Sequence, residues 1–168
     1  MSDSHIGTRF DRLPPTEETD DSRPSREDVL RFFDTAFGIE SSVFEPYTLW
    51  ERGRGKVWAF NGEQPTPVRV EAMGIHILRT RNQFWKPTTD GMQLFGRHAS
   101  TNIVELDRRK ANAFWSGETV DIGWDGDPHY VIVFHSYAGD RVPIGVGLAR
   151  DSELESLVPK ARRRNHFE

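Results

Sequence analysis

The segment 25–38 shows apolar residues at helical spacing and predicts an amphipathic helix. Ser25, a residue type that favours N-caps, precedes the apolar stripe, and Gly38 supplies a stop after it. Rings exposed to water are costly, so we expect the three phenylalanines of the stripe to be buried. The stripe consists of Val29, Phe32, Phe33, Ala36 and Phe37.

Most other apolar positions alternate with polar ones or form short runs, which predicts strands. The segments 47–51 and 56–60 flank a glycine-bearing turn and predict a hairpin, and the run 130–134 predicts a buried central strand. The strand at 142–149 has one small face with Gly145 and Gly147, against which a helix or an RNA backbone could approach closely. Further strands are expected at 69–71, 74–81, 102–106 and 118–124.

The stretch 84–106 has the most unusual combination of residue types in the chain. Phe84 and Trp85 are adjacent rings, and Pro87 disfavours a helix at that point. Thr88 and Thr89 are candidate N-caps for a short apolar helix that follows. This combination predicts a surface corner on a small β fold.

Basic residues lie both within that stretch and just before it. Gly96 is expected in the left-handed conformation past the short helix, and Arg97 and His98 follow it. Upstream, Arg79 and Arg81 end the strand predicted at 74–81, on the face where two isoleucines precede them. A third helix is expected at 107–115, capped by its first residue.

The polar and proline-rich segment 1–24 has little to bury and predicts a disordered acidic tail. We divide the rest into an N-terminal helix and hairpin extension, 25–65, and a domain at 66–168 with a basic C-terminal tail. That tail contains Lys160, Arg162, Arg163 and Arg164. The net charge of −4 argues against unspecific attraction to nucleic acid, but leaves a local basic surface possible.

The composition also bears on compartment and source. The absence of Cys excludes disulfides, Cys-ligated zinc and thiol nucleophiles. No segment has the length of a membrane span or the apolar centre of a signal peptide, so we expect a soluble cytoplasmic protein that does not bind a membrane. The 18 Arg against 4 Lys, with abundant Asp and Glu, are typical of a haloarchaeal protein.

No motif for catalysis is present. The sequence lacks a dinucleotide fingerprint, a Walker motif, HExxH and the GxSxG elbow. The six His are scattered without metal-ligand spacing, and no carboxylate pair lies at an apolar strand end. We therefore expect that the protein is not an enzyme and that it binds neither a cofactor nor a metal.

Five short motifs resemble one known RNA-binding domain: KPT at 86–88, LFG at 94–96, TNIVEL at 101–106, PIGVGL at 143–148 and VPKARR at 158–163. In this order they are similar to the PUA-like domain that accompanies Sun-type RNA cytosine-5 methyltransferases, over about residues 25–164. The resemblance implies a β-rich α+β pseudo-barrel with short flanking helices that binds structured RNA. It does not imply methyl transfer, because the thiol and the cofactor domain are missing.

The function expected from these features is a stand-alone module that binds tRNA or rRNA, as an adaptor in RNA modification or ribosome assembly. Its partners would be the RNA and a modification enzyme or ribosome-assembly factor. A protein–protein interaction module that keeps the fold without an RNA site is the alternative, and a small hydrolase with a buried carboxylate is a weaker third. The predicted RNA-binding residues are Arg79, Arg81, Trp85, Lys86, Arg97, His98, Gly145, Gly147, Lys160, Arg162, Arg163 and Arg164.

Overall fold

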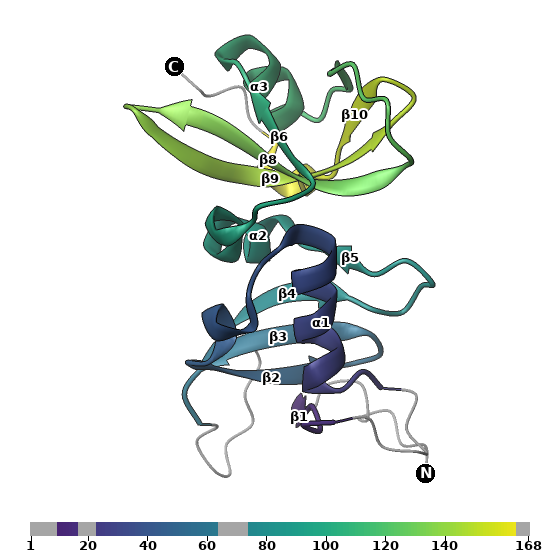
Figure 1. The fold of residues 1–168 in the computed structure, drawn as a ribbon, viewed down its shortest axis with the longest axis vertical. Helices are drawn as coiled ribbons and strands as arrows, with labels where there is room; N and C mark the ends of the chain where they lie inside the picture. Colours follow the sequence, from purple (N-terminus) through teal and green to yellow (C-terminus); the bar gives the residue numbers. More distant parts are fainter. Residues whose placement is uncertain (1–9, 17–22, 64–73, 164–168) are drawn as a thin grey trace.

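The computed structural model describes residues 10–16, 23–63 and 74–163. Within these ranges the chain forms two five-stranded sheets and three α-helices, so the α+β, β-rich class is confirmed. In Figure 1, α1 lies against the sheet nearer the N-terminus, α2 lies between the two sheets, and α3 lies on the other sheet. None of the helices in the described ranges is long and apolar enough to cross a membrane.

Sheet A is an antiparallel meander in the order β1-β2-β3-β4-β5. Its central hairpin confirms the prediction for the segments 47–51 and 56–60. The last strand is only two residues long and forms one edge of the sheet. The strands are β1 (Phe10–Arg12), β2 (Tyr47–Arg52), β3 (Lys56–Asn61), β4 (Ile75–Arg79) and β5 (Lys86–Pro87).

Sheet B has the order β6-β8-β9-β10-β7. Its β6 and β8 are parallel, connected through α3, and the other pairs are antiparallel. The predicted central strand at 130–134 lies within β8, between β6 and β9. The strands are β6 (Ile103–Leu106), β7 (Val120–Asp121), β8 (His129–Tyr137), β9 (Asp140–Arg150) and β10 (Glu153–Ser156).

The helices begin at the predicted caps. Ser25 accepts from the backbone N–H of Asp28 in a reciprocal capping box before α1 (Arg26–Phe37). Thr88 caps α2 (Thr89–Phe95), and Asp107 caps α3 (Arg108–Trp115). Three short 3-10 turns complete the described elements: η2 (Ser41–Phe44), η3 (Gly96–His98) and η4 (Lys160–Arg162).

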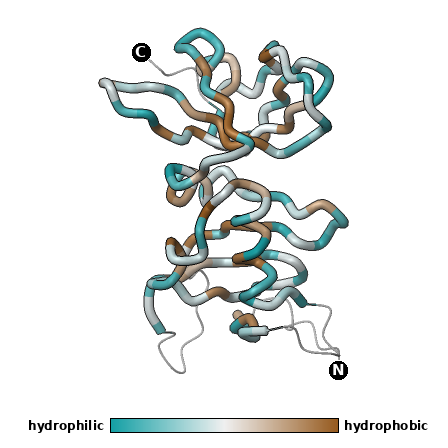
Figure 2. The backbone as a smooth tube through the Cα atoms, viewed as in Figure 1, coloured by the Kyte–Doolittle hydropathy of each residue, from teal (hydrophilic) through white to brown (hydrophobic). Residues whose placement is uncertain are grey.

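The core consists of two main clusters. One joins α1, α2 and sheet A, and it includes Ile132, Phe134 and Val146 from sheet B, so the two sheets share packed side chains. The other lies beneath α3 in sheet B. In Figure 2 the hydrophobic segments follow the strands and helices. Of the predicted phenylalanine stripe, Phe33 and Phe37 are fully buried, whereas Phe32 is only half-buried.

The prediction of a disordered tail at 1–24 is wrong for its middle part. Residues Phe10–Arg12 form β1 against β2, and Phe10 and Leu13 are buried. Phe10 packs edge-on against Trp58, and this contact anchors the short strand within a charged segment. Residues 1–9 and 17–22 of the predicted tail lie outside the described residues.

Two further predictions are changed by the structure. The boundary placed after residue 65 falls inside sheet A, because β4 and β5 continue it. Gly96 has φ −60° rather than a left-handed conformation, and its lack of a side chain lets it pack on Ile132 and Pro143. The strand β10 was not predicted, and the segment 69–71 lies outside the described residues.

Candidate functional site

Three cations stand side by side across sheet A, and we call them the cation row: Lys56, Arg79 and Lys86. Lys56 is the register partner of Arg79, and Arg79 is the register partner of Lys86. Within the described part of the chain, the side chains of these three residues make no ion pair and no hydrogen bond. Like charges directly opposite on neighbouring strands destabilise a sheet, so the row is an unbalanced positive feature.

A bulge in β4 places this row on the face of sheet A that points away from α1. The register passes from Val57–Leu78 to Trp58–His76 and leaves Ile77 unpaired. Ile77 and Leu78 can therefore both be buried in the core. We call the opposite face the outer face. There the Trp58 and His76 rings stack, with centroids 5.3 Å apart.

The row changes the acid–base properties of its neighbours. Burial, the charge of Arg79 and that of Lys56 together lower the pKa of His76 to about 4, against the opposing effects of Leu78 O and Asp90. Burial and then Arg79 lower the pKa of Lys86, while Glu155 opposes the shift. His76 is therefore neutral at pH 7 and adds no charge to the row.

Two other predicted arginines approach the outer face. Arg81 follows β4 next to the β2–β3 turn, where the Thr80 N–H donates to Gly55 O at 2.9 Å. Arg162 forms an ion pair with Asp90 near the start of α2. Arg162, Asp90, His76 and Trp58 line an open hollow of about 520 Å³. The fold thus brings Arg79, Lys86 and Arg162 to one side of sheet A, although Arg162 is neutralised there.

The two glycines predicted to bind RNA lie on β9 and face the protein interior. Gly145 and Gly147 are buried. An added Cβ at Gly147 would lie 2.4 Å from Leu154 Cδ1, and one at Gly145 would lie 3.3 Å from Phe114 Cε1. The small face of the strand packs against α3 and β10. This packing agrees with the interpretation that a helix of the protein, rather than an RNA backbone, approaches the face closely.

The basic C-terminal run is partly engaged in the fold rather than free for RNA. Arg163 donates from Nε to Val158 O at 3.1 Å and packs against Gly117. With Arg162 paired to Asp90, only Lys160 of the described run is exposed without a partner. Arg164 lies outside the described residues. Replacing the whole run is therefore a structural change as well as a charge change.

Arg97 and His98 are exposed and follow the C-terminal end of α2, whereas Lys86 precedes the N-terminal end of that helix. Their guanidinium and imidazole contact each other at 3.3 Å in η3. The preceding Gly96 packs on Pro143 of β9. On β9, Leu148 lies five residues after Pro143, a separation of ~17 Å at ~3.4 Å per residue. Leu148 and Trp85 line the same hollow, so Arg97 and His98 lie at a different part of the surface from Trp85.

Trp85 belongs to a second feature, which we call the aromatic groove. It has a volume of about 530 Å³ and opens between the β4–β5 loop, α1 and β8. Trp85 packs on Phe32 with ring centroids 5.6 Å apart, whereas Phe84 exposes 74% of its surface. Its lining also includes Phe37, Gln83, His129, Tyr130 and Leu148.

The sequence did not identify two members of these features. Lys56 was assigned only to a hairpin strand, because its place in the row depends on the β3–β4 register and on the bulge. Tyr130 was assigned to a buried strand, but it is half-buried and faces the groove. Alternation within the hairpin could have suggested an outward Lys56, but not which cations it would meet.

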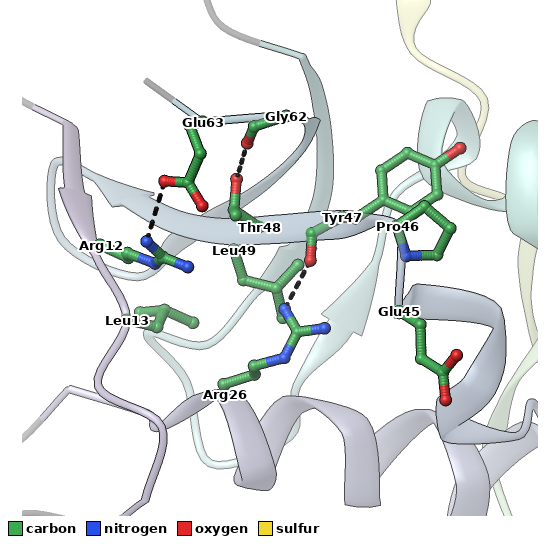
Figure 3. Close-up of a pocket in the computed structure, with 10 residues that line it drawn as sticks. All are labelled: Arg12, Leu13, Arg26, Glu45, Pro46, Tyr47, Thr48, Leu49, Gly62 and Glu63. Atoms are coloured by element: carbon green, nitrogen blue, oxygen red, sulfur yellow. Dashed lines mark hydrogen bonds and ion pairs between the residues drawn. The ribbon is translucent and has the colours of Figure 1, made fainter. Parts of the chain in front are cut away.

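A third hollow, shown in Figure 3, lies between β1, β2 and the start of α1. Arg26 donates to Tyr47 O at 2.7 Å and to Phe44 O at 2.9 Å, and Arg12 pairs with Glu63 at 3.2 Å. Burial, followed by the charge of Arg12, lowers the pKa of Arg26. Arg26 thus fastens the start of α1 to β2 and η2, and Arg12 is engaged by Glu63, so neither cation of this hollow is free.

The weaker hydrolase interpretation depended on a deep pocket with a buried carboxylate. The buried Glu51 accepts from the Gly55 N–H at 3.2 Å and stabilises the β2–β3 turn. It lines none of the three hollows. In the ranges that the structure describes, no group of three or more His, Cys, Asp or Glu could hold a metal ion.

Residues 1–74 match the model of a family of unknown function, DUF7122. The match covers β1, α1, β2 and β3 and ends just before β4. Lys56 lies inside it, and Arg79 and Lys86 lie outside it. No curated protein matches the sequence.

Proposed function

We propose that the protein is a stand-alone RNA-binding module with a PUA-like fold. It binds structured RNA, tRNA or rRNA, and acts as an adaptor in RNA modification or ribosome assembly rather than as an enzyme. The observation that carries the proposal is the cation row, three positive side chains aligned on neighbouring strands without ion pairs among the described residues. The motif resemblance over residues 25–164 supports RNA as the anion.

The arrangement of the row suits a phosphate backbone. Neighbouring strands lie ~4.8 Å apart, so the row spans ~10 Å across β3, β4 and β5. An anion removes the repulsion between the three charges, which is a gain made only in the complex. Because the whole chain carries −4, attraction for RNA must come from this local surface and must weaken with salt.

The test compares two triple variants of equal charge. K56A/R79A/K86A removes the row, and R31A/R109A/R141A removes three exposed cations from α1, α3 and β9. Binding to a tRNA transcript is measured against salt concentration. Each phosphate contact adds ~0.7–0.9 to the slope of log K against log salt, so losing the row should reduce that slope by ~2–3.

The control variant should keep the wild-type slope. No binding by wild-type protein at low salt, or an equal loss in both variants, would refute the proposal. A DNA duplex of the same length, measured in parallel, tests whether the 2′-hydroxyl and A-form shape matter.

The protein–protein interaction module remains the second candidate, and one observation favours it. Phe84 projects from the β4–β5 loop with most of its surface in water, next to an apolar groove. Exposed apolar features of this kind often bind partner proteins. A wild-type protein that ignores RNA at low salt but forms a complex that the Phe84→Ala variant loses would support this function instead.

A further inference from the structure

We propose that the aromatic groove binds one unpaired nucleobase of the RNA whose phosphates lie on the cation row. This inference rests on the proposed function and names the part of the RNA that the groove would take. It follows from two features of the same short hairpin, β4–β5, which contributes cations to one face of sheet A and rings to the other.

The hairpin brings the two features together at its end. Lys86 ends the row, and Trp85 and Phe84 precede it directly in the chain. Successive side chains of an extended strand point to opposite faces, so Lys86 lies on the outer face while Trp85 packs against Phe32 of α1. Because β5 is an edge strand, a polynucleotide that leaves the row at Lys86 reaches the groove around that edge.

The groove and the end of the row are close, because Trp85 lines the groove and directly precedes Lys86 in the chain. The charge of Glu155 acts on Lys86. Leu148 is the register partner of Glu155 and lines the groove. The row therefore ends where sheet B forms the opposite wall of the groove.

The lining favours a flat ring over an aliphatic ligand. Trp85 is held by Phe32, and Phe37 holds the His129 ring edge-on at 6.1 Å. Bases stack on such rings irrespective of their sequence. The volume of about 530 Å³ lies in the range of small-ligand sites.

Two polar groups remain available to contact the edge of a base. Within the described ranges, neither the Gln83 amide nor the Tyr130 hydroxyl makes a hydrogen bond. By contrast, His129 Nδ1 lies 2.5 Å from Tyr130 O, and Nε2 lies 3.5 Å from Asn102 Nδ2. The neighbouring positive row is what distinguishes a nucleotide from an apolar peptide as the occupant.

The experiment uses the full-length protein and two RNA hairpins that differ in one nucleotide. One hairpin is fully paired, and the other carries a single bulged 2-aminopurine, whose fluorescence falls when it stacks. Base–aromatic stacking corresponds to a change in affinity of ~5-fold to 150-fold. We expect the bulged hairpin to bind tighter by at least ~5-fold, with quenching of the probe.

The variants isolate the ring of Phe84, which is exposed and can be changed without disturbing the core. Phe84→Ala and Phe84→Leu should abolish the preference for the bulge and the quenching, and Phe84→Tyr should retain both. Tyr137→Ala is the matched control, because Tyr137 is also a largely exposed ring but lies at the β8–β9 turn.

The outcomes separate this inference from the proposed function. Equal binding of both hairpins by wild-type protein, with loss of both in K56A/R79A/K86A, overturns the base site and leaves RNA binding intact. No binding of either hairpin overturns the proposed function and the base site together. Phe84 variants that keep the preference for the bulge show that the groove has another occupant, such as a protein.

Discussion

His76 should make the protein less stable as the pH falls below neutrality. Its pKa is about 4 in the folded protein, against an ordinary value of 6.5. The neutral ring is favoured in the folded state, so the unfolded chain takes up the proton first. The stability that depends on neutral His76 is therefore present above pH 6.5 and is lost as the pH falls from 6.5 towards 4.

The size of the effect follows from the two pKa values. A shift of one pKa unit corresponds to ~1.4 kcal/mol, which sets an upper limit of ~3 kcal/mol on the total loss. Solvent screens the half-buried ring, so the actual loss is smaller than this limit. Between pH 7 and pH 5 the linkage relation predicts a loss of ~2 kcal/mol, in a range where most carboxylates stay ionised. For a domain of this size, ~2 kcal/mol is a large fraction of the total stability.

The assay is urea denaturation at pH 7 and pH 5 for wild type and His76→Phe. The phenylalanine at position 76 keeps a ring beside Trp58 but cannot titrate. It should remove ~2 kcal/mol from the difference between the two pH values. A His76→Phe variant with the wild-type pH dependence would show that burial and the neighbouring cations do not disfavour protonation of His76.

Two predictions concern packing. Gly147→Ala should lower the free energy of unfolding by ~1–3 kcal/mol, because the new Cβ meets Leu154 and Glu155 O, and Gly145→Ala should cost less. Equal costs in urea denaturation would contradict the difference in space. Phe10→Ala should cost ~3 kcal/mol, since this ring is buried on β1 against Trp58. An unchanged midpoint would mean that β1 contributes nothing and that the segment behaves as the tail expected from sequence.

Features determined by neighbouring residues could be predicted from the sequence. The caps at Ser25, Thr88 and Asp107 were predicted because each depends on one side chain and on backbone groups within the next turn. The β2–β3 hairpin was predicted because its turn contains glycines.

Features determined by distant residues could not be predicted. From the sequence, Arg162 and Arg163 were interpreted as part of a free basic run, because their partners Asp90 and Val158 O are apparent only in the folded structure. The short β1 was missed because three residues in a charged segment carry no periodic signal. The cation row depends on a one-residue bulge opposite Val57 and Trp58, which no periodicity records.

The register of β5 is what allows one hairpin to contribute to both features. Pro87 is buried opposite Leu78, which leaves Lys86 opposite Arg79 on the outer face. Thr88 then donates from its N–H to Ile77 O at 3.0 Å and begins α2, so the strand cannot slide along β4. A slip of one residue would turn Lys86 into the core and Trp85 onto the row. The unbalanced charges are therefore held in place by the packing around them, as expected where local stability is given up for binding.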